Sequence, residues 1–178
     1  MTRNVYLFGT CVIDLFMPQA GLDAVRVLES AGITVHYPRG QSCCGQPAWS
    51  SGNPDEARAV ARAQLDLFPE PWPVIVPSGS CAGMMRKHWP ALFRADPVFE
   101  PKAHALAGRV HEFAEYLTCV LGWEMPAGAP AAGTPAAGTP AAGTPAAATE
   151  DVVLHTSCSA RREMGTRTHG VALLDALP

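Results

Sequence analysis

Short apolar runs bounded by Gly, Pro or polar residues recur along the first 125 residues of the chain. The first run is Val5–Phe8, which Gly9 ends, and Ile33–Tyr37 and Val74–Val76 follow it. Runs of this length that are rich in β-branched and aromatic residues predict buried strands. Together with one later run, the pattern predicts four strands, at residues 5–8, 33–37, 74–76 and 152–154.

Amphipathic segments that predict helices lie between these runs. Pro18 opens a segment with apolar residues three apart on one side, and Gly32 stands where a helix C-terminus is capped. Asn53-Pro54 is a strong helix start, with Pro at the first helical position, and we expect this helix to run to about Phe68. Apolar residues trace one face of a third helix over residues 108–122.

The alternation of strand and helix signals favours an α/β fold. We expect a parallel sheet flanked by helices, with right-handed crossover connections. In open sheets of this kind, ligands bind outside the carboxyl ends of the strands. The loops that follow the strands are therefore where functional residues are expected.

One segment has a composition that cannot build a core. Residues 126–149 consist only of Ala, Pro, Gly and Thr, and the unit Pro-Ala-Ala-Gly-Thr occurs three times from Pro130. A segment without large apolar side chains buries too little surface to fold, so we interpret it as a flexible linker. The linker separates a first domain, residues 1–125, from a short C-terminal segment, residues 150–178.

The cysteines are placed mainly after the predicted strands. Cysteines follow each of the four strands, and only Cys119 lies inside a predicted helix, where we interpret it as a small buried side chain that lies apart from the others. Because the carboxyl ends of parallel strands share one edge of the sheet, we expect the remaining thiols to meet there. They are Cys11, Cys43, Cys44, Cys81 and Cys158.

Thiolate sulfur is the ligand that iron–sulfur and zinc centres select. The placement therefore predicts a metal centre at this edge of the sheet. Two alternatives stay open at this point: the thiols are buried filler, or Cys81, which follows Ser78-Gly79-Ser80, is a nucleophilic or redox thiol at a helix N-terminus.

The charge and hydropathy of the chain argue against several classes of function. The 13 Lys and Arg against 16 Asp and Glu give a net charge of −3, which argues against a nucleic-acid partner. No apolar stretch approaches the about 20 residues of a membrane-spanning segment, and no export signal is predicted. We therefore expect a cytoplasmic protein, in which six cysteines are ligands, redox groups or filler rather than disulfides.

The cysteine motifs resemble those of a known family. Cys11, the run Cys43-Cys44-Gly45 and Cys81 are similar to the cysteine-rich CCG domain of heterodisulfide reductases and of the glycolate oxidase iron-sulfur subunit. The runs Gly40–Ala48 and Leu154–Cys158 are most similar to the branch of this family that acts in lactate utilization. The likeness extends over nearly the whole chain outside residues 126–149.

The resemblance implies a Rossmann-like three-layer CCG domain over residues 1–125. It also implies a cofactor, a [4Fe-4S] cluster with zinc as the alternative. The implied ligands are Cys11, Cys43, Cys44 and Cys81, with Cys158 as a further candidate.

The match to the family pattern has two departures. Met84 stands where the pattern has the last cysteine of this copy, a replacement shared by the lactate-utilization branch. Cys158 matches the first cysteine of a second CCG copy. Residues 150–178 are therefore expected to be the start of an incomplete second copy in a C-terminally truncated chain.

The activity implied by the family is electron transfer. We expect an iron–sulfur-binding oxidoreductase subunit in the oxidation of L-lactate to pyruvate, acting with partner iron–sulfur and other subunits of a lactate-oxidising system. Catalytic residues are not assigned, and enzymatic activity is expected only with the partners. The alternative is a non-catalytic CCG interaction module, zinc-stabilised or apo, or a degenerate fragment.

Overall fold

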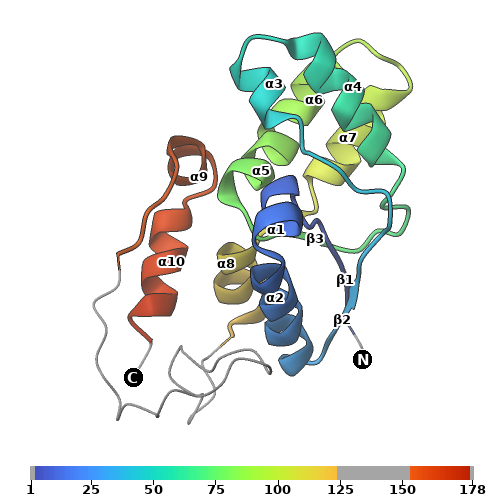
Figure 1. Ribbon diagram of the computed structural model, residues 1–178. Coiled ribbons are helices and arrows are strands. Elements are labelled where there is room, and N and C mark those ends of the chain that lie inside the picture. Colours follow the sequence, from blue (N-terminus) through green and yellow to red (C-terminus); the bar gives the residue numbers. More distant parts are fainter. Residues whose placement is uncertain (1–2, 124–152, 177–178) are drawn as a thin grey trace.

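The sheet of this protein is parallel and has the strand order β2-β1-β3-β4 (Figure 1). The computed structural model describes residues 3–123 and 153–176. The strands are β1 (Arg3–Leu7), β2 (Ile33–His36), β3 (Val74–Val76) and β4 (Val110–Glu112). The parallel arrangement confirms the predicted α/β fold.

Helices occupy the connections between the strands and follow the last of them. Two of the helical segments, η1 and η2, are π-helical and directly continue the short α-helices α5 and α8. Within residues 3–123 and 153–176, no helix is long and apolar enough to cross a membrane. The helices are α1 (Cys11–Phe16), α2 (Pro18–Ser30), α3 (Gln46–Ser50), α4 (Pro54–Leu65), α5 (Gly79–Gly83), η1 (Met84–His88), α6 (Trp89–Leu92), α7 (Phe99–Ala107), α8 (Phe113–Glu115), η2 (Tyr116–Leu121), α9 (Cys158–Glu163) and α10 (Thr166–Leu174).

Both faces of the sheet are buried, which gives the three layers expected of the fold. Tyr6 and Val74 contribute to an apolar cluster with residues of α4, α5, η1, α6 and α7. Val5, which precedes Tyr6, and Ile75, which follows Val74, pack with residues of α2 and η2 on the other face. All three residues of β3 and the last three of β1 are buried, which is why these stretches are continuous apolar runs.

The first two predicted helices are confirmed, with one change of boundary. Gly32 lies just beyond α2 with a φ of +75°, a backbone conformation that favours glycine. Helix α4 begins at Pro54 and ends at Leu65, so the prediction of a helix to Phe68 was slightly long. The guanidinium of Arg109 donates to the carbonyl oxygens of Phe68, Glu70 and Trp72 and thereby holds this connection out of the helix.

The predicted fourth strand and third helix were wrong in detail. The fourth strand of the sheet is Val110–Glu112, which pairs with β3, and Val153 and Leu154 are not in a strand, whereas residue 152 lies outside the described residues. Within the predicted third helix, residues 108–122, only Phe113–Glu115 (α8) and Tyr116–Leu121 (η2) are helical. A strand of three residues is too short to show alternation, so the helical spacing beyond it masked the strand.

The C-terminal helices pack against the first domain. Ala160 of α9 lies against Gly79 of α5, and the His88 Nε2 atom of η1 is 2.9 Å from the Glu163 Oε1 atom of α9. Leu173 of α10 packs against the apolar cluster that contains η2. Residues 126–149, the predicted linker, lie outside the described residues.

The close approach at Gly79 gives a direct test of the α5–α9 contact. A Cβ atom at this position would lie 2.5 Å from the Cβ of Ala160 and 2.6 Å from the Cγ2 of Thr166. We expect Gly79→Ala to lower the free energy of unfolding by about 1–3 kcal/mol, because a packed contact must open to admit the methyl group. Chemical denaturation measures this loss.

Gly108→Ala is the matched control for this substitution. Its Cβ would meet only the carbonyl oxygens of His104 and Ala105, at 3.6 and 3.8 Å, which is ordinary contact. Equal stability of the two variants would contradict close packing of α9 on α5.

Candidate metal centre

Cys11 is held at the carboxyl end of β1 by a short, constrained connection. It is the first residue of α1, and Thr10, which precedes it, accepts a hydrogen bond from the Ile13 N–H at 3.4 Å. Thr10 is buried and has a φ of +55°, which is unusual for a β-branched residue. The strained backbone therefore lies directly beside a candidate ligand.

The Cys43-Cys44-Gly45 segment lies in the connection between β2 and α3. Gly45 has a φ of +86°, and its N–H donates to the Cys43 Sγ atom at 3.4 Å. A Cβ atom on Gly45 would lie 3.1 Å from the carbonyl oxygen of Ala57 in α4. Glycine is needed here because the chain turns with a positive φ and also passes close to α4.

Buried polar side chains anchor this connection to the helices around it. Gln64 of α4 is 1% exposed; its Oε1 accepts from the Ser42 N–H at 3.0 Å, and its Nε2 donates to the Ser42 Oγ at 2.8 Å. The Trp89 Nε1 atom of α6 donates to the Cys44 carbonyl oxygen at 2.9 Å. The positions of both vicinal cysteines are therefore set by contacts far along the chain.

A third anchor joins the first and second cysteine connections. Gln41 accepts from the Gly9 N–H at 3.0 Å and donates to the Leu7 carbonyl oxygen at 2.9 Å. Because Leu7 ends β1 and Gly9 leads into α1, this one side chain fixes the loop of Cys43 beside the loop of Cys11.

Cys81 enters the site from the start of α5, directly after β3. Its thiol lies beside that of Cys44, and both side chains are buried. A hydrogen bond from Cys44, together with bonds from the Ser78 and Ser80 hydroxyls, lowers the pKa of Cys81 to about 7. The same contact and burial raise the pKa of Cys44, so the two sulfur atoms share one proton with Cys44 as the donor.

The four thiols form two pairs that influence one another, and we call this set the cysteine cluster (Cys11, Cys43, Cys44 and Cys81). Burial, followed by a hydrogen bond with Cys43, raises the pKa of Cys11, and the charge of Cys81 adds to that shift. Cys44 likewise responds to the charges of both Cys81 and Cys43. These contacts link the four cysteines, and their role as one set of ligands stays a prediction.

The cysteine cluster fits an iron–sulfur or zinc centre in its chemistry and place. Thiolates are the ligands of both centres, and all six cysteines are free. Among the described residues, no three Cys, His, Asp or Glu side chains lie in positions that would hold one metal ion as they stand. The thiols are thus arranged as two neighbouring pairs rather than as a tetrahedral set.

The other candidates occupy different positions. Cys158 is exposed at the start of α9, a helix that packs against α5. Met84 is fully buried in the apolar cluster, as expected for a packing residue. Cys119 lies apart from the cysteine cluster, but the interpretation of it as a buried side chain was wrong: it is exposed on η2, beside Thr118 and His169.

A surface cleft of about 500 Å³ near the ends of α4 and α7 does not involve these residues. Its lining includes Arg58, Arg62 and Phe99, and none of the clustered cysteines. The Arg58 side chain donates hydrogen bonds to the Leu92 carbonyl oxygen and to the Asp55 carboxylate, and the Arg62 guanidinium lies over the Phe99 ring. The cleft therefore has no part in the metal-centre hypothesis.

Sequence reasoning missed the residues that support the site. Gln64 and Trp89 are buried residues of helices α4 and α6, and a single buried polar or aromatic residue in a helix does not form a recognisable sequence motif. Gln41 lies inside the cysteine motif itself, but its partners belong to β1 and the loop after it. Their roles depend on contacts between segments that lie 22 to 45 residues apart.

Comparisons with known proteins agree with this site. Residues 5–86 match the model of the CCG family, described as a cysteine-rich domain. Lactate utilization protein A 2 of Bacillus cereus (strain 03BB102) is 32% identical over 174 residues, which cover 96% of this chain and 63% of that protein. Lactate utilization protein A of Bacillus subtilis (strain 168) is 35% identical over 171 residues, which cover 96% of this chain and 64% of that protein.

The chain spans less than two thirds of the length of these relatives. No solved structure gives a significant match. The matched range, residues 5–86, contains all four residues of the cysteine cluster and the anchors Gln41 and Gln64, whereas the anchor Trp89 lies just beyond it. Residues 5–86 therefore match a cysteine-rich domain of the CCG family, and the chain is similar to lactate utilization protein A over 96% of its length.

Proposed function

We propose that the chain is an iron–sulfur-binding electron-transfer subunit of a lactate-oxidising system. The observation that carries this proposal is the cysteine cluster: four thiols from three separate connections that influence one another's ionisation at one edge of a parallel sheet. The proposed ligands are Cys11, Cys43, Cys44 and Cys81, with Cys158 as a further candidate. The proposed centre is a [4Fe-4S] cluster.

The residues around the cysteine cluster have identifiable tasks in this proposal. Cys44 and Cys81 are buried and supply ligands from the interior, whereas Cys11 and Cys43 are half-buried and lie toward solvent. The Ser78 and Ser80 hydroxyls and the Gly45 N–H are hydrogen-bond donors beside sulfur atoms, and such donors tune the potential of a bound cluster. A bound cluster supplies one-electron redox chemistry.

The lactate part of the proposal rests on the names of the relatives. Removal of electrons from a 2-hydroxy acid needs a cofactor that accepts them and groups that bind the carboxylate. We therefore assign oxidation of lactate to pyruvate to an assembly with iron–sulfur and other partner subunits. The free cysteines are consistent with a cytoplasmic location, which we also propose.

The paired arrangement of the thiols favours a second candidate function. The thiols form two pairs, Cys11 with Cys43 and Cys44 with Cys81, in which each donor has a sulfur acceptor and needs no metal ion as a partner. The second candidate is therefore a non-catalytic CCG interaction module, apo or stabilised by zinc. Metal content distinguishes the two functions.

Anaerobically purified chain should contain iron and acid-labile sulfide in equal amounts, about four of each per chain for a [4Fe-4S] cluster. Cys44→Ser should lose most of both, because a buried thiolate ligand is replaced by a hydroxyl that iron binds poorly. Colorimetric iron and sulfide analysis, with the visible absorption spectrum, measures the loss.

Cys119→Ser is the matched control for metal content, because Cys119 lies apart from the cysteine cluster and should leave iron and sulfide unchanged. Zinc without sulfide would replace the proposed function by the second candidate. Absence of any metal after anaerobic reconstitution with iron and sulfide would contradict both metal-bound forms.

Purified chain alone should not oxidise lactate with an artificial electron acceptor. Candidate partner subunits should restore turnover, and Cys43→Ser should then abolish it, because the proposed path of electrons runs through the cysteine cluster. Steady-state assays with and without partners check this. Turnover by the chain alone would refute the role as a subunit.

The metal-free cysteine cluster should hold one thiolate at neutral pH. The pKa of Cys81 is about 7 because Cys44 donates to it, so the thiolate forms as the pH rises through 7 and is lost below it. Cys44→Ala removes the donor and should move the Cys81 midpoint upward, toward its ordinary value of 9.0. The ¹³Cβ chemical shift of Cys81, followed by NMR against pH, reports the midpoint.

Cys158→Ala should leave that midpoint in place. An unchanged Cys81 titration in Cys44→Ala would show that the two thiols do not share a proton.

A further inference from the structure

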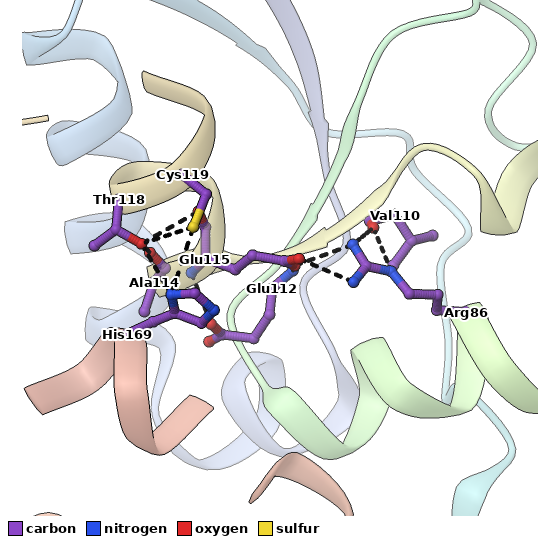
Figure 2. A network of polar contacts seen from close by, with 8 residues as sticks. All are labelled: Arg86, Val110, Glu112, Ala114, Glu115, Thr118, Cys119 and His169. Carbon is purple, nitrogen blue, oxygen red and sulfur yellow. Dashed lines mark hydrogen bonds and ion pairs between the residues drawn. The ribbon is translucent and has the colours of Figure 1, made fainter. Parts of the chain in front are cut away.

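A second, separate group of chemically active side chains lies between η2 and α10 (Figure 2). The Cys119 Sγ atom is 3.7 Å from the Nδ1 atom of His169, and the Thr118 Oγ1 atom is 3.1 Å from the same nitrogen. Cys119 is exposed and His169 is half-buried. The two side chains come from segments 50 residues apart, so only the packing of α10 on η2 creates this pair.

The hydrogen bonds around Thr118 indicate which way the imidazole donates. The Thr118 hydroxyl donates to the Ala114 carbonyl oxygen at 2.8 Å, which uses its one proton. Its oxygen can then only accept from His169, so Nδ1 carries a hydrogen in this arrangement. The same nitrogen is 3.7 Å from the Cys119 sulfur, so the imidazole is also a neighbouring polar group for the thiol.

The charged side chains in the same network, Arg86, Glu112 and Glu115, are already bonded to one another or to backbone groups. Arg86 bonds the Glu115 carboxylate with both terminal nitrogens, at 3.0 Å each, and also the Val110 carbonyl oxygen. Glu112 and Glu115 form a reciprocal cap at the start of α8, and each accepts the backbone N–H of the other. Figure 2 shows this ion pair beside the Cys119–His169 pair.

We propose that Cys119, placed beside His169, is a reactive thiol that exchanges with small-molecule disulfides. An accessible thiol beside a histidine is the arrangement in which cysteine becomes a nucleophile at neutral pH. The surface position of Cys119 admits a small disulfide, whereas Cys44 and Cys81 are buried and Cys11 and Cys43 are half-buried. The site lies outside residues 5–86 and is distinct from the proposed metal centre.

The exchange balances without a further reagent. Cys119 gives its proton to solvent, and the thiolate attacks one sulfur atom of a disulfide RSSR. A Cys119–S–S–R bond forms as the S–S bond of the reagent breaks, and RS⁻ leaves and takes up a proton. The protein thiol is oxidised to the mixed disulfide while one half of the reagent is reduced to a thiol.

The adduct would stand at the contact between η2 and α10. His169 is held there by Thr118, and Leu173 of the same helix packs on the apolar cluster that contains Tyr116 and Leu117. A group attached to Cys119 competes with Thr118 for the space beside the imidazole. Modification would therefore act first on the attachment of the C-terminal helix.

Incubation of the full chain with oxidised glutathione at pH 7 tests the proposal. Mass spectrometry of the Cys119 and Cys158 peptides gives a separate rate for each thiol. His169→Asn keeps an N–H near the position of Nδ1 but cannot carry a charge, so we expect the Cys119 rate to fall about tenfold while the Cys158 rate is unchanged. His169→Arg restores a cationic donor and should recover part of the loss.

The pH dependence supplies a second readout. If His169 assists Cys119, the dependence of the Cys119 rate on pH should differ between the wild-type chain and His169→Asn, whereas an unassisted thiol would give the same profile in both. Equal Cys119 rates and equal pH profiles in the two proteins would overturn the proposal. A parallel fall at Cys158 would also overturn it, because the effect would then belong to packing rather than to the pair.

Discussion

The buried hydrogen bond from the Trp89 indole to the Cys44 carbonyl oxygen is the contact on which the site most depends. The connection that carries Cys43 and Cys44 is irregular, so its backbone groups need partners from elsewhere when they are buried. Trp89 is fully buried and supplies that partner from α6. A carbonyl left without a donor in this position would cost about 1–3 kcal/mol, a large part of the stability of a small domain.

The helical segment that contains Trp89 also carries Cys81, the candidate ligand that follows β3. Residues from Gly79 to Leu92 run continuously through α5, η1 and α6, with Cys81 near the start and Trp89 near the end. The segment therefore contributes a thiol beside Cys44 and a donor to its carbonyl group. Because both side chains project from one continuous helical segment, the placement of Cys44 relative to Cys81 is coupled to the position of that segment.

The C-terminal helices meet the domain next to its chemistry. Helix α9 rests on Gly79, two residues before Cys81, and its Glu163 pairs with His88 of η1. Helix α10 brings His169 to Cys119 on η2. Packing of residues 158–174 thus bears on both groups of thiols, one buried and paired with sulfur, the other exposed and paired with an imidazole.

The fold class, two long helices and the placement of cysteines after the first three strands could be predicted from the residues alone. Apolar runs buried on both faces, Pro54 at a helix start and Gly32 beyond a helix end act through local backbone and solvent preferences, so neighbouring residues suffice to predict them. The fourth strand could not be predicted in this way, because Val110–Glu112 becomes a strand by pairing with β3. The pairing of Cys44 with Cys81, the anchors Gln64 and Trp89, and the exposure of Cys119 beside His169 likewise depend on contacts between distant segments, which no local pattern of residues encodes.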